Sequence, residues 1–177
     1  MIYKLFGFIG VILICSCNSQ KNNYMELESI TMQVENGNWQ ELSVQERLKR
    51  LSSMDYKNSN AEDAAEMKNQ AVLLWQTYTD SDSKFQYQIV KLLANYTLID
   101  NNYFDSLNLW RIAKGYEPTE KDCVLYIALL EYITEGQIKE AKLLELLNSD
   151  EYKNLNAYNH CLELYTTDKK RKNNEFE

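Results

Sequence analysis

The chain has 177 residues, of which 45% are hydrophobic and 25% charged, and its 26 acidic and 19 basic side chains give a net charge of −7. A chain this acidic repels phosphate backbones, which excludes a role that depends on a basic nucleic-acid-binding surface. A single histidine and the lack of any Cys-x-x-Cys spacing leave no ligand set for a metal site.

Residues 1–16 have the three parts of an export signal. Lys4 lies near the start, an apolar run of ten residues covers positions 5–14, and the small residue Ser16 ends the segment. A helix needs roughly twenty apolar residues to cross a bilayer core, so this run is too short to serve as a stable span. The pattern predicts a signal peptide that is removed and takes no part in the fold.

The end of this signal, Ile14-Cys15-Ser16-Cys17, resembles the lipobox of bacterial lipoproteins. In that family the cysteine thiol receives a diacylglycerol, the signal is cut just before it, and the new amino group receives an acyl chain such as palmitate. The resemblance implies that Cys17 is the lipidated first residue, with no other cofactor. Cys15 fits less well, because Ile14 would then occupy the small-residue position. The alternative is an ordinary secretory signal with incidental cysteines.

Residues 17–23 are polar and aperiodic, as expected of a flexible tether between the lipid and the folded domain. Position 18 is Asn rather than Asp, which by resemblance to lipoprotein sorting in Gram-negative bacteria favours the outer membrane. We therefore expect an envelope protein that faces the periplasm. Loss of Lys4 with the signal leaves 18 basic against 26 acidic side chains, a net charge of −8.

The rest of the chain predicts one all-α domain over residues 24–165, followed by a frayed and solvated polar tail at 166–177. Every strong apolar periodicity is close to 3.6 residues, and the few glycines and the one proline fall between periodic segments. We expect about eight short antiparallel helices, arranged as an array of helical hairpins. They cover residues 25–36, 39–52, 61–79, 83–99, 103–114, 120–135, 137–148 and 151–165.

Local signals support several of these helices. The spacings Ser43-x-x-Glu46 and Ser59-x-x-Glu62 are typical of capping boxes, in which each side chain satisfies a free backbone amide at a helix start. Within residues 83–99, apolar side chains recur three and four residues apart and predict one buried stripe: Phe85, Ile89, Leu92, Tyr96 and Ile99.

The segment 120–135 is apolar on every side and predicts a central, buried helix. It contains Cys123, which could form a disulfide with Cys161 in an oxidising compartment. Both cysteines could equally be small core residues. His160 is most simply a surface or packed residue.

Three joints along the chain share a turn residue, a spacer, a large apolar residue and, further on, a small or apolar one. They begin at Gly37, Asn101 and Gly136, and the last two are 35 residues apart. Over residues 88–150 this resembles the tetratricopeptide repeat, whose period is 34. The resemblance implies that the large residues Trp39, Tyr103 and Ile138 pack back on the preceding helix, and that small residues such as Ala94 let helices approach. The first spacing, 64, departs from the repeat, and any antiparallel helical hairpin can produce similar joints.

No group of titratable residues in the sequence suggests a catalytic site, so we expect no enzymatic activity. Tyrosine and tryptophan are enriched at binding surfaces because they bury a large area and keep a polar tip. Four of them lie near predicted turns and are candidate binding anchors, although core positions are the simpler alternative for many aromatic residues: Trp39, Tyr103, Trp110 and Tyr116.

Two functions fit these features. The first is a membrane-anchored protein–protein interaction module. The second is an immunity lipoprotein that binds and neutralises an antibacterial toxin in the periplasm. Both predict a protein or peptide partner with a basic surface, because the net charge is −8 after processing. A toxin gene next to this one would favour the second function, and an envelope-assembly operon the first.

Overall fold

A computed structural model of the chain describes residues 39, 41–78 and 82–174. The expected export signal, the lipidated Cys17 with its tether, and the helix predicted at 25–36 lie outside the described residues. The chain divides into two compact units, and Trp39 belongs to the first. The second unit, residues 42–177, contains all the described helices.

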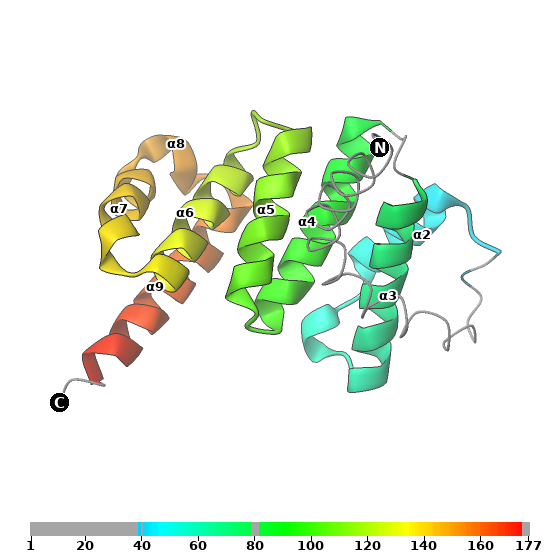
Figure 1. Ribbon diagram of the computed structural model, residues 1–177, viewed down its shortest axis with the longest axis horizontal. Helices are drawn as coiled ribbons and strands as arrows, with labels where there is room; N and C mark the ends of the chain where they lie inside the picture. Colours follow the sequence, from blue (N-terminus) through cyan, green and yellow to red (C-terminus); the bar gives the residue numbers. More distant parts are fainter. Residues whose placement is uncertain (1–38, 40, 79–81, 175–177) are drawn as a thin grey trace, which may run out of the picture. The chain divides into compact units, whose positions relative to one another are not determined.

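The second unit confirms the all-α prediction. Within the described residues it has eight α-helices, two short 3₁₀ helices and no strand. The successive helices from α3 to α6 run in alternating directions (Figure 1). In chain order they are α2 (Val44–Ser53), η1 (Tyr56–Asn58), α3 (Ala61–Thr77), α4 (Ser83–Ile99), α5 (Tyr103–Tyr116), α6 (Lys121–Glu135), η2 (Gln137–Lys139), α7 (Glu140–Asn148), α8 (Asp150–Lys153) and α9 (Asn156–Asn174).

The start of α2 is set by a capping box. The Ser43 hydroxyl accepts a hydrogen bond from the Glu46 amide at 3.4 Å, and the Glu46 carboxylate accepts one from the Ser43 amide at 2.8 Å. This confirms the predicted box. The helix predicted over 39–52 therefore begins later than expected, at Val44, because Ser43 has the extended backbone of a cap.

The start of α3 differs from the prediction by one residue. Asn60, not Ser59, is the cap, and its side-chain oxygen accepts a hydrogen bond from the Asp63 amide at 2.8 Å. The Ser59 hydroxyl is engaged elsewhere, because it donates to the Asp55 carbonyl at 2.6 Å at the end of η1. The box expected between Ser59 and Glu62 is therefore wrong.

Each helix packs on the next one along the chain. Three side-chain contacts also join helices that are not consecutive, namely α2 to α4, α4 to α6 and α6 to α9. They are the hydrogen bond from the Tyr96 hydroxyl to the Leu51 carbonyl (3.1 Å), the ion pair between Lys91 and Asp122 (3.1 Å), and the hydrogen bond between Tyr126 and His160 (2.9 Å).

Small residues let α4 and α5 approach closely. The Ser106 hydroxyl donates to the Ala94 carbonyl at 2.9 Å, and neither residue has any exposed surface. The turn between the helices passes through Asn101 in the left-handed region, at φ 58°. Asn is one of the few side chains that tolerate this conformation. The α4–α5 hairpin thus has the close approach expected at this joint.

The joint after α6 differs from the expectation. Gly136 turns the chain at φ 84°, and the next three residues form η2. The side chain of Ile138, predicted to pack back on α6, is 88% exposed. The 3₁₀ turn directs it to solvent before α7 begins at Glu140. The preceding helix α6 is largely buried, as predicted, with Leu125 and Leu129 fully covered.

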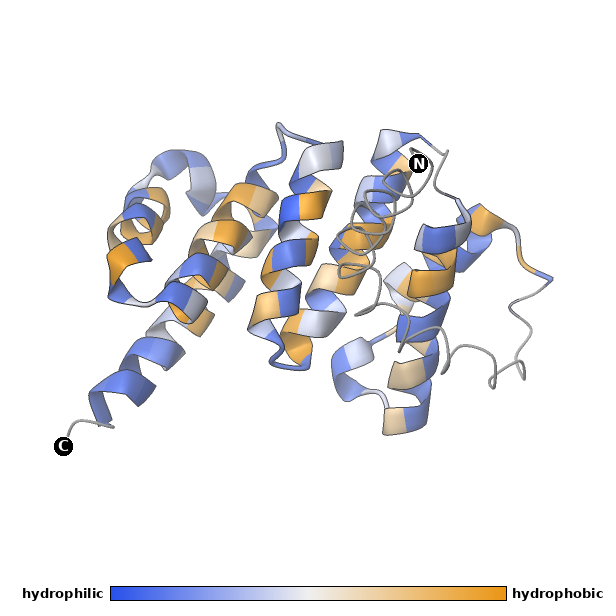
Figure 2. Ribbon diagram, in the orientation of Figure 1, coloured by the Kyte–Doolittle hydropathy of each residue, from blue (hydrophilic) through white to orange (hydrophobic). Residues whose placement is uncertain are grey.

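The predicted frayed tail is helical instead, because α9 continues to Asn174. Figure 2 shows its last turns as strongly hydrophilic, and they are held by charge pairs rather than apolar packing. Asp168 is only 8% exposed and pairs with Arg171 at 2.7 Å and Lys172 at 2.6 Å. Lys169 also reaches Glu140 of α7 at 2.8 Å. Among the described residues, no helix combines the length and apolarity that crossing a bilayer requires.

Candidate binding groove

A groove of about 550 Å³ lies between α2 and α4. Its α2 wall carries Gln45, Lys49 and Ser52, which are spaced four and three residues apart and therefore share one helix face. On α4 a matching stripe supplies the opposite wall, with Phe85, Gln88, Leu92 and Asn95 three, four and three residues apart. The groove is thus formed by two facing helix stripes.

The described lining combines apolar side chains with polar ones that are neutral or cationic. Leu48, Phe85 and Leu92 supply the apolar surface. Among the described residues that line the groove, Lys49 and Lys91 are charged and none is a carboxylate. The remaining four lining residues are neutral and polar: Gln45, Ser52, Gln88 and Asn95.

Two stacked tyrosines hold the walls of the groove together. Tyr56 of η1 lies parallel to Tyr96 of α4, with ring centroids 4.2 Å apart. The Tyr56 hydroxyl donates to the Asp100 carboxylate at 3.0 Å, while that of Tyr96 donates to the Leu51 carbonyl of α2. Burial raises the pKa of Tyr96 to about 12 and also raises that of Tyr56, so both hydroxyls stay protonated and act as donors.

Lys91 joins the groove to α6. Its ammonium lies 3.1 Å from the Asp122 carboxylate and 5.5 Å from the centre of the Tyr87 ring. These contacts hold the side chain in place but do not cover it, because it remains 34% exposed. Lys49, on the opposite wall, is exposed and has no ion-pair partner among the described residues.

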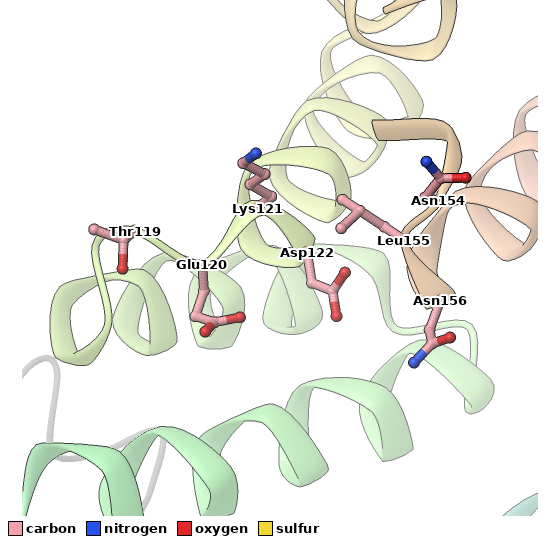
Figure 3. A pocket seen from close by; sticks show the side chains of 7 residues that line it. All are labelled: Thr119, Glu120, Lys121, Asp122, Asn154, Leu155 and Asn156. Atoms are coloured by element: carbon pink, nitrogen blue, oxygen red, sulfur yellow. The ribbon is translucent and has the colours of Figure 1, made fainter. Parts of the chain in front are cut away.

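A second, smaller hollow of about 360 Å³ lies where the start of α6 meets the connection from α8 to α9 (Figure 3). Most of its lining is polar, with Glu120 and Asp122 on one side and Asn156 on the other. Two of its charged side chains already have partners outside the hollow. Asp122 pairs with Lys91, and Lys121 pairs with Glu151 at 2.7 Å. Leu155 is the one hydrophobic side chain among the described residues that line this hollow, whereas the α2–α4 groove has three, so that groove is the better candidate.

The four predicted aromatic anchors do not form one surface. Trp110 has no exposed surface and stacks on Tyr126 at a centroid distance of 4.3 Å, so it is a core residue and not an anchor. Trp39 belongs to the first unit, where it is 4% exposed, and its role as an anchor stays a prediction. Tyr103 and Tyr116 are half-buried at opposite ends of the 14-residue helix α5, roughly 20 Å apart at 1.5 Å per residue.

The possible disulfide is not formed. Cys123 and Cys161 are both free and fully buried thiols. Burial raises the pKa of Cys123 to about 11 and raises that of Cys161 further, so both remain protonated. They occupy the core as small apolar residues, the alternative that the sequence had left open. His160 is half-buried beside Cys161, and its ring hydrogen-bonds Tyr126.

Sequence reasoning missed the groove, although part of the signal was present. The stripe expected to be buried on α4 is only partly covered: Ile89 and Tyr96 are buried, Phe85 and Leu92 line the groove, and Ile99 is 38% exposed. The α2 stripe of two polar residues and a lysine looks like any solvated helix face. What distinguishes it from such a face is its position opposite the α4 stripe, with which it lines the groove.

Within the described residues, no three side chains of the metal-binding types cluster as a site would require. No known protein family, curated protein or solved structure shows a significant match to this chain.

Proposed function

We propose that this chain is a lipid-anchored envelope protein whose helical unit binds a segment of a partner protein in the α2–α4 groove. The observation that carries the proposal is the groove itself, which combines partly covered apolar side chains, Phe85 and Leu92, with polar side chains on a firmly held pair of helices. The carboxamides of Gln45, Gln88 and Asn95 make no hydrogen bond to the described residues. A partner segment would satisfy these groups while covering Leu92 and Phe85.

The series of contacts from α2 through α4 and α6 to α9 supports a binding role. In arrays of helical hairpins each unit contacts only its neighbours, and every second helix contributes to one continuous surface that can hold an extended partner. The resemblance to tetratricopeptide repeats belongs to this proposal. The close approach at Ala94 and Ser106 favours it, whereas the exposed Ile138 counts against it.

The anchor in this proposal is Cys17, carrying a diacylglycerol and an N-acyl chain, with the protein held at the outer membrane and facing the periplasm. The support is the lipobox-like sequence and the polar segment that follows it. Two or three acyl chains suffice for stable attachment to a membrane. The anchor would confine the groove to partners in the envelope.

A photo-crosslinking residue placed at Gln88, in the groove, tests this function in intact cells. The matched control places the same residue at Lys114, an exposed position on α5 that does not line the groove. We expect an envelope protein to be joined at Gln88 and not at Lys114, and mass spectrometry identifies it. Adducts that are absent at Gln88, or that are the same at both positions, would contradict the proposal.

The immunity function remains the alternative, favoured by the net charge of −7. An immunity lipoprotein would present carboxylates to the basic surface of a toxin, and such contacts depend strongly on salt. The identity of the crosslinked protein separates the two functions. A secreted toxin supports immunity, and a resident envelope protein supports the interaction module.

A further inference from the structure

We infer that the α2–α4 groove takes an extended peptide segment rich in carboxylates, which Lys49 meets from one wall and Lys91 from the other. This inference rests on the proposed function and names the chemistry of the partner at the groove. The negative net charge of the whole chain suggests a basic partner instead. A bound segment, however, meets only the residues that line the groove, and these decide which charge it prefers.

The groove carries positively charged side chains although the protein as a whole is acidic. The chain has 26 acidic side chains, yet the nine residues that line the groove include two lysines and no acid. A basic partner segment would bring its charges next to Lys49, which has no ion pair among the described residues, and next to Lys91, whose one ion pair is with Asp122. Juxtaposed like charges oppose association, whereas carboxylates from the partner would be attracted.

The two lysines have donors available for such a partner. Lys49 has no ion pair among the described residues, so its ammonium is open to a new acceptor. Lys91 is held by Asp122 at 3.1 Å, but an ammonium has three donors, and the side chain keeps about a third of its surface exposed. The partner carboxylate would therefore share Lys91 with Asp122 rather than displace it.

The other lining residues indicate a peptide rather than an isolated anion. The three carboxamides each offer both donors and acceptors, as the backbone of an extended chain requires. Leu48, Phe85 and Leu92 offer an apolar strip that a small anion could not use. The volume of about 550 Å³ falls in the range of roughly 300–1,000 Å³ that binding sites for compact ligands occupy. The segment therefore combines acidic side chains with apolar ones.

Three fluorescent eight-residue peptides test this inference on the purified full chain. Each has a central pair of leucines, flanked in turn by glutamates, glutamines or lysines, and binding is measured by fluorescence anisotropy. We expect the glutamate peptide to bind tightest. K49Q and K91Q should each weaken it by up to about five-fold, the upper end of the range for a solvent-exposed ion pair.

K114Q is the matched control, because it changes the net charge of the protein by the same amount at an exposed lysine outside the groove. It should leave the affinity unchanged. Lys49 is exposed, so loss of folding does not complicate K49Q, and circular dichroism verifies the fold of K91Q, which loses its pair with Asp122.

The inference is overturned if the lysine peptide binds as tightly as the glutamate peptide, if K114Q weakens binding as much as K49Q, or if no peptide binds. The proposed function would survive any of these results when the crosslink at Gln88 still forms, since the groove would then bind a partner of different chemistry. If that crosslink also fails, the function fails as well.

Discussion

Replacing Trp110 separates a core residue from a binding anchor, because the two roles predict opposite results. The side chain has no exposed surface, and its ring stacks on Tyr126 with planes 13° apart. Truncating a fully buried tryptophan to alanine typically costs about 3–5 kcal/mol, through lost apolar burial and the cavity left behind. Domains are stable by only about 5–15 kcal/mol, so Trp110→Ala should leave the protein marginally folded.

A second variant, Trp110→Phe, tests how much of the expected loss of stability comes from ring volume. The indole nitrogen of Trp110 is buried and has no hydrogen-bond partner within the described structure. Trp110→Phe therefore loses ring volume but no hydrogen bond, and it keeps an aromatic ring against Tyr126. We expect a cost of about 1–2 kcal/mol, less than half that of the alanine variant.

Urea denaturation followed by circular dichroism measures both free energies of unfolding. Tyr103→Ala is the control, because this half-buried residue was predicted to be an anchor and should cost only about 1 kcal/mol. The reasoning is refuted if Trp110→Ala destabilises the protein by less than Tyr103→Ala does.

Three further predictions address the anchor, the histidine and the thiols. Cys17→Ala should abolish acyl labelling and release the protein from the membrane fraction while Cys15→Ala does neither, and membrane retention of the first variant would disprove the lipobox interpretation. Burial lowers the pKa of His160 below its usual 6.5, so the stability that its neutral form contributes is complete above pH 6.5 and is lost as the pH falls through the lowered value. The free energy of unfolding should then drop less between pH 7.5 and pH 5.5 in His160→Gln than in the parent, and equal drops would exclude this histidine as the cause. Cys123 and Cys161, being buried and protonated, should resist iodoacetamide at pH 8 in the native protein and react in urea, as peptide mass spectrometry would reveal; native labelling would contradict their burial.

Helix positions followed closely from the sequence where the signal was local. The helix predicted over 83–99 is α4, Ser83–Ile99, and the capping box at Ser43 is present. Both depend on residues within a few positions of one another, so the signal is readable from the sequence alone. The cap of α3 was misplaced because the neighbouring Asn60 offers a side-chain oxygen that accepts from the Asp63 amide, one residue later than the sequence pattern suggested.

The prediction of a frayed C-terminal tail was wrong for a different reason. The run of charges after Thr166 resembles a disordered tail when each side chain is considered alone. In the structure, Asp168 pairs with two cations one turn further along α9, and Lys169 reaches across to Glu140 on α7. Glu140 is 29 residues distant from Lys169 in the sequence, so this stabilising contact cannot be read from the tail alone.

The sequence by itself determined that the described chain is helical and roughly where each helix begins and ends, because the 3.6-residue period and the capping residues act over single turns. Only the tertiary structure decided which faces are covered. Periodicity marks an apolar stripe but not what lies against it, so Trp110 and Tyr103 looked alike although one is enclosed and the other half-exposed. The pairing of α2 with α4, which turns two ordinary stripes into a groove, depends on the Tyr96 contact with Leu51, 45 residues distant in the chain. Contacts at such separations arise when helices pack, and no local pattern specifies them.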